Sequence, residues 1–145
     1  MLGGVVSRSG YSDECEHVWL WMGAVKRALH GKRGQAFLRE IVAALDALPN
    51  KRLIRDELVN EAGECCAIGA VAIYRGLDTS ELGYHDPSDV GEAFGIASSM
   101  AAEIEFRNDE DFDNVTPERR FELMRAWVVE QIVPTADELD KEPGK

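Results

Sequence analysis

Residues 34–50, with the sequence GQAFLREIVAALDALPN, decide the fold class of this chain. Their large apolar residues recur three or four positions apart, as they do along one face of an α-helix. The pattern stops at Pro49 and Asn50, and proline ends a helix because its ring blocks the next turn. We therefore predict a helix over residues 34–48 with one apolar stripe, made of Phe37, Leu38, Ile41, Leu45 and Leu48.

The segment before this stretch carries the same helix signals. Asp13 and Glu16 form a capping-box pattern, and Gly31 provides the stop. Trp19 lies off the apolar stripe of this segment, so we expect it at the surface. The predicted buried stripe is Val18, Trp21, Met22, Val25, Ala28 and Leu29.

Further helices are predicted after residue 50. Asp86-Pro87 and Thr116-Pro117 each place a capping residue before a proline at the first helical position. The apolar residues 65–74 predict a buried helix, whereas the pattern of residues 52–60 leaves open whether they form a helix or a strand. We expect an all-α, single compact domain of five or six helices, with at most one short hairpin near residues 52–68.

Length and composition limit the class of protein. The chain has 145 residues, of which 45% are hydrophobic, so one core can form without a disulfide or a structural metal. We expect a flexible N-terminal arm at residues 1–11, a helical domain at 12–133 and a flexible acidic tail at 134–145. No signal peptide or membrane span is recognised, so we expect a cytoplasmic protein that binds no membrane. We expect free thiols at Cys15, Cys65 and Cys66.

Charge is divided unevenly along the chain, whose net charge is -11. Residues 1–75 contain 10 basic and 9 acidic residues, whereas residues 76–145 contain 6 and 18. An acidic surface repels nucleic-acid phosphates and attracts basic proteins. We predict that residues 78–113 bind a basic partner; the alternative is an acidic surface that only keeps the protein in solution. The predicted partner-binding residues are Asp86, Asp89, Glu92, Glu103, Glu105, Asp109, Glu110, Asp111 and Asp113.

Residues 90–104 suggest an alternative function, namely binding to DNA. Residues 90–104 resemble a helix-turn-helix, but the second helix would present Glu103 and Glu105 to DNA, so we expect a structural corner and no direct binding of duplex DNA. A helix-turn-helix-like transcriptional or DNA-associated regulator is the alternative function.

A basic cluster could pair with the acidic half and allow self-association; its members are Lys26, Arg27, His30, Lys32, Arg33, Lys51, Arg52 and Arg55.

No motif for catalysis or for a cofactor is found, so we expect no enzyme; a small enzyme with an unrecognised site is the third alternative. The alternate spacing of Asp109, Asp111 and Asp113 is that of a calcium loop, but Asn114 and Arg120 stand where glycine and glutamate are needed. Zinc-ligand spacing is also absent, so we expect no metal. The soft ligands considered are Cys15, His17, Cys65, Cys66 and His85.

Five segments spread over roughly residues 19–132 carry a resemblance to a known family: GQAFLRE (34–40), CAIGA (66–70), NDE (108–110), TPERR (116–120) and MRAW (124–127). In their order the chain resembles an uncharacterised family of small acidic proteins encoded by bacteriophages and prophages of Gram-negative bacteria. This family has no activity to carry over. The resemblance implies a bacterial host cell and a context in which small accessory proteins bind host machinery, as anti-CRISPR and other counter-defence inhibitors do. It thus implies a non-enzymatic protein that inhibits or modulates a basic host protein or nucleoprotein complex.

Overall fold

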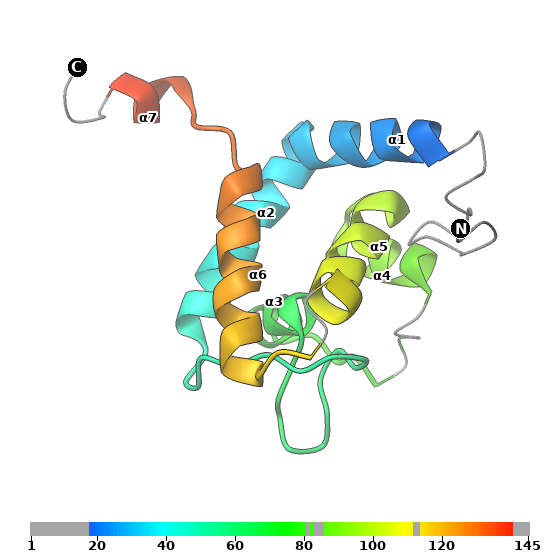
Figure 1. Ribbon diagram of the computed structural model, residues 1–145, viewed down its shortest axis with the longest axis vertical. Helices are drawn as coiled ribbons and strands as arrows, with labels where there is room; N and C mark the ends of the chain where they lie inside the picture. Colours follow the sequence, from blue (N-terminus) through cyan, green and yellow to red (C-terminus); the bar gives the residue numbers. More distant parts are fainter. Residues whose placement is uncertain (1–17, 81, 83–85, 112–113, 141–145) are drawn as a thin grey trace.

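A computed structural model describes residues 18–80, 82, 86–111 and 114–140, which contain helices and no strand (Figure 1). The prediction of a single all-α fold is confirmed. The described residues form seven α-helices and one π-helical segment, η1. The bounds are α1 Val18–His30, α2 Lys32–Ala47, α3 Ala67–Arg75, α4 Pro87–Phe94, α5 Ser98–Phe106, η1 Arg107–Asp111, α6 Pro117–Gln131 and α7 Ala136–Asp140.

Helix α2 forms the middle of the core and packs against α1, α3 and α6. Its predicted stripe is buried, and Leu38, Ile41 and Leu45 have no exposed surface. Only Gly31 separates α1 from α2, and a Cβ atom at Gly34 would lie 1.8 Å from the carbonyl oxygen of Ala28. The two helices can meet this closely because glycine has no side chain, and α1 extends sideways from the end of α2 (Figure 1).

Helix α5 is the second buried helix, since it packs against α1, α3 and α4. Its sequence, SSMAAEIEF, is apolar or small on most sides, and the residues from Met100 to Glu105 are all buried. A helix that is apolar all round is expected inside a protein. The two glutamates of α5 are therefore buried together with its apolar residues.

The connection between α2 and α3 contains no strand. The Ile54 N–H donates to the Cys65 carbonyl at 2.9 Å, and Val59 forms a single antiparallel bridge with Cys65. At Asp56 the backbone has a φ of 69°, which breaks an extended conformation. The predicted hairpin is thus reduced to one bridge, and residues 52–60 form neither a helix nor a strand.

The segment expected to be a flexible tail contains α7. The Glu138 N–H donates to Thr135 Oγ1 at 3.1 Å and the Thr135 N–H donates to Glu138 Oε1 at 2.8 Å, which is a capping box. Arg39 of α2 also pairs with Glu138 at 2.8 Å, and its hydrogen bond is the main reason that the pKa of Glu138 falls to about 2. These contacts join the tail to α2. The predicted N-terminal arm, 1–11, lies outside the described residues.

Candidate functional site

Three of the predicted partner-binding carboxylates share the surface of α4. Asp86, Asp89 and Glu92 are exposed, while Val90 and Phe94 on the opposite side of the helix are buried. The Asp86 carboxylate also caps α4, because it accepts hydrogen bonds from the backbone N–H groups of Ser88 and Asp89 at 3.0 and 3.3 Å. Helix α4 therefore holds a negatively charged surface in a fixed position against the core.

Three other predicted partner-binding residues are buried, so the structure corrects their assignment to an exposed surface. Glu103 is 3% exposed, Glu105 is 9% exposed and Asp109 is 6% exposed. The reason is tertiary packing: α1, α3 and α4 cover α5, which carries Glu103 and Glu105, while η1, which carries Asp109, packs against α5 and α6. The side chains of Glu110, Asp111 and Asp113 lie outside the described residues.

Asp109 belongs to a buried polar network. Its carboxylate accepts a hydrogen bond of 2.7 Å from the side-chain amide of Asn108, which also donates to the Ile54 carbonyl at 2.9 Å. The Asn108 side-chain oxygen accepts from the Ala67 N–H at 3.2 Å, and the Arg120 guanidinium donates to the Asn108 carbonyl. This network ties η1 to α3, to α6 and to the irregular connection.

Glu105 is a carboxyl group in an unfavourable environment. Among the described residues, its Oε2 atom is buried and has no hydrogen-bond partner. Burial, followed by repulsion from Asp109 and Asp86, raises the pKa of Glu105 to about 8. At neutral pH this side chain is therefore mostly protonated, and it adds little negative charge to the molecule.

The helix-turn-helix-like segment forms a tight corner between α4 and α5. Gly95 has a φ of 77°, and the Ile96 N–H donates to the Gly91 carbonyl at 2.9 Å. A Cβ atom at Gly91 would lie 2.7 Å from the Ile96 carbonyl oxygen. A DNA-reading second helix must enter a groove, whereas α5 is covered by other helices. The geometry therefore favours the structural corner.

The described thiols have environments that oppose nucleophilic chemistry. Cys65 and Cys66 are free and buried, and Cys66 caps α3 by accepting from the Gly69 N–H at 3.4 Å. Burial raises the pKa of Cys65 to about 11 and raises that of Cys66 further, so both are protonated at neutral pH. No group of three metal-binding side chains gathers in the part of the chain that the structure describes. The other candidate ligands, Cys15, His17 and His85, lie outside it.

Part of the predicted basic cluster is engaged in local contacts. Arg52 lies 3.5 Å from Glu64, and the Lys51 amine donates to the Leu48 carbonyl at 2.7 Å. The exposed basic residues around the corner of α1 and α2 remain as a smaller group: Lys26, Arg27, His30, Lys32 and Arg33.

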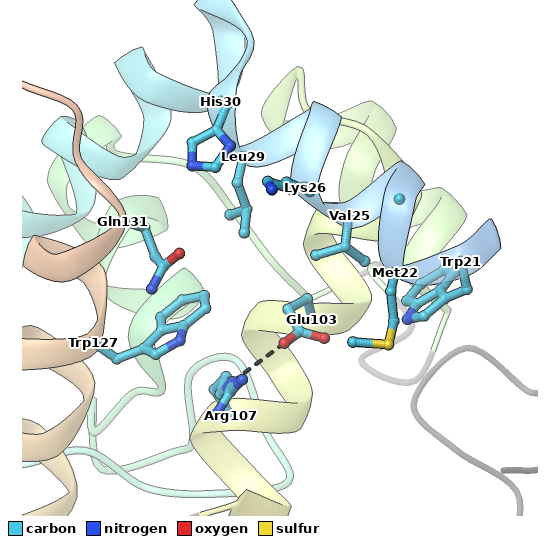
Figure 2. A pocket seen from close by; sticks show the side chains of 11 residues that line it. Trp21, Met22, Val25, Lys26, Leu29, His30, Glu103, Arg107, Trp127 and Gln131 are labelled. Atoms are coloured by element: carbon cyan, nitrogen blue, oxygen red, sulfur yellow. Dashed lines mark hydrogen bonds and ion pairs between the residues drawn. The ribbon is translucent and has the colours of Figure 1, made fainter. Parts of the chain in front are cut away.

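A groove that the sequence did not predict lies between α1, α5 with η1, and α6 (Figure 2). Its volume is about 450 Å³. The Arg107 guanidinium lies 5.4 Å from the centre of the Trp127 ring, and its Nε is 3.2 Å from Glu103 Oε2. Met22, placed in the buried stripe by its spacing, is 55% exposed at this groove. The side chain of Trp19 lies outside the described residues.

One signal in the sequence could have pointed to this groove. Arg107 is the only lysine or arginine among residues 78–113, and it stands four positions after Glu103, a spacing that brings two side chains of a helix together. The contribution of Trp127 could not be found in the same way, because only the fold brings α6 beside α5.

Comparison with family models, with curated proteins and with solved structures finds no match to this chain. Among the described residues, no helix has both the length and the apolar character needed to cross a membrane.

Proposed function

We propose that this protein is a non-enzymatic interaction protein that uses the acidic surface of α4 to bind a basic surface of a partner protein. The observation that carries this proposal is the joint exposure of Asp86, Asp89 and Glu92 on one helix whose other side is buried. Fixed charges of one sign steer an oppositely charged partner and orient it on contact.

The partner class follows from the charge of the surface and from the phage resemblance together. A basic host protein or nucleoprotein complex, such as one that handles nucleic acid or acts in defence, carries the surface that α4 would attract. Binding there would inhibit or modulate the host complex. Duplex DNA is not a partner in this proposal, because α4 and DNA are both negatively charged.

Charge reversal on α4 tests the proposal. The double variant Asp89→Lys, Glu92→Lys is compared with Glu57→Lys, Glu61→Lys, which makes the same change in net charge at exposed positions in the connection between α2 and α3. Both proteins are titrated with a lysine-rich peptide by calorimetry at low and at physiological salt, after circular dichroism has shown that they fold.

We expect the wild-type protein to bind the peptide and to lose affinity as salt rises. The α4 variant should bind about tenfold more weakly than the control variant at low salt, since two close charges are reversed in it. Equal weakening of both variants would show that only net charge matters, and the proposal would then be wrong.

A further inference from the structure

The groove between α1, α5 and α6 combines apolar walls with cationic side chains. Val25, Leu29 and Trp127 are buried residues that line it, and Lys26 and Arg107 also line it. Among the described residues that line the groove, Glu103 is the one carboxylate, and it pairs with Arg107. The groove is therefore a positively charged, apolar site on a protein whose net charge is -11.

Trp21 supplies an unused hydrogen-bond donor at this groove. Its Nε1 atom is buried and meets no acceptor among the described residues. A buried donor without an acceptor is destabilising, so a bound acceptor would remove a cost that the free protein bears. Figure 2 shows the Trp21 nitrogen on the edge of the ring turned toward Met22. The Met22 side chain is flexible and more than half exposed, and its movement would open this donor to the groove.

The charges of the groove decide between a cationic and an anionic ligand. Two tryptophans and a carboxylate resemble an aromatic cage for a cation. In this protein, however, Arg107 already lies against the Trp127 ring and pairs with Glu103. A ligand cation would have to displace that guanidinium, whereas an anion gains from Lys26, which lines the same groove outside the Arg107–Glu103 pair.

We propose that this groove binds a small aromatic carboxylate, with its ring against the apolar walls and its carboxylate facing Lys26 and Trp21 Nε1. The volume of about 450 Å³ lies within the range of pockets that hold small molecules. The apolar walls supply affinity, and the cation and the N–H donor select for the carboxylate. This site is separate from the α4 surface, and binding to it does not depend on the proposed function.

Three naphthalene probes of nearly equal size test the charge preference: 1-naphthoate, 1-naphthalenemethanol and 1-naphthylmethylammonium. Binding to the full-length protein is followed by calorimetry and by NMR shifts of the indole N–H signals. We expect 1-naphthoate to bind about tenfold more tightly than either other probe, because a hydrogen bond to a carboxylate is stronger than one to a neutral oxygen and the ammonium probe is repelled by Lys26. Equal binding of the alcohol, tighter binding of the ammonium probe, or binding of none of the three would overturn the proposal.

Variants then locate the binding site. Lys26→Gln should weaken 1-naphthoate binding about tenfold, and Trp21→Phe, which keeps an aromatic ring but removes the N–H, should weaken it about threefold. Lys32→Gln is the matched control, since Lys32 is equally exposed but lies outside the groove. If Lys26→Gln and Lys32→Gln bind the probe equally well, the groove is not the site.

Discussion

Helices α4 and α5 follow each other in the chain and carry similar numbers of acidic residues, yet those of α4 are exposed to solvent and those of α5 are buried. Asp89 and Glu92 of α4 are exposed, whereas Glu103 and Glu105 of α5 are buried. Helix α4 has one apolar side and lies at the edge of the core, while α5 is covered by α1, α3 and α4. The density of acidic residues along a sequence is therefore a poor guide to the charge of a surface.

This difference has a functional consequence. Of the acidic surface predicted from residues 78–113, the three carboxylates around α4 are exposed and can be reached by a partner. Glu103, Glu105 and Asp109 are buried and cannot. Glu103 pairs with Arg107 one turn further along the chain and Asp109 accepts from the adjacent Asn108, so both carboxylates are engaged in contacts inside the protein. The variants below test whether the two helices differ in this way.

The largest effect on the free energy of unfolding is expected when the same negative charge is placed in α5 and, for comparison, in α4. Ala101 in α5 is fully buried, and Ala93 in α4 is exposed. Ala101→Asp should lower the free energy of unfolding by about 3 kcal/mol or more, because an unpaired charge enters the core. Ala93→Asp should lower it by less than about 1 kcal/mol. Urea unfolding of both variants gives the comparison, and similar losses would contradict the burial of α5.

A smaller effect with a pH dependence is expected at Glu105. Its pKa is raised from 4.5 to about 8 in the folded protein, so the folded state binds this proton more tightly than the unfolded state does. The contribution of Glu105 to the free energy of unfolding therefore falls as pH rises from about 4.5 to about 8. Glu105→Gln removes this decline and should be more stable than the wild-type protein by about 1–3 kcal/mol at pH 8.5.

The matched control for Glu105→Gln is Glu92→Gln on α4, which makes the same chemical change at an exposed position. Its stability should stay within about 0.5 kcal/mol of the wild-type value at every pH. The measurement is the difference in unfolding free energy between variant and wild type at pH 5 and pH 8.5. A difference that is the same at both pH values for Glu105→Gln would refute the raised pKa.

The smallest effect is expected at the start of α4. Asp86→Ala removes the cap of the helix and should cost about 1 kcal/mol, whereas Asp86→Asn keeps an acceptor there and should cost only a few tenths. Thermal unfolding of the two variants measures the difference. If both variants unfold at the same temperature, the Asp86 side chain does not cap α4, and the claim that the cap fixes the acidic surface of α4 is wrong.

Local patterns predicted the helices well, but not their surroundings. The stripe from Phe37 to Leu48 and the cap-and-proline pairs before α4 and α6 act within a few residues, so the sequence shows them directly. The Thr135–Glu138 capping box is likewise a local pattern, but the composition of residues 134–145 favours a flexible tail, and the structure has α7 there. Burial of Glu103 and Glu105 depends on helices far away in the sequence, and the groove requires three separate elements. These features appear only when the chain has folded.

Chemical labelling of carboxyl groups, read by mass spectrometry, tests the central claim most directly. Exposed carboxylates are coupled to an amine by a carbodiimide, first in the free protein and then with the lysine-rich peptide bound. We expect Asp86, Asp89 and Glu92 to react about tenfold faster than Glu103 and Glu105, whose low exposure excludes the reagent, and to become protected by the peptide. Equal labelling of α4 and α5, or α4 carboxylates that remain reactive beneath the bound peptide, would contradict the account.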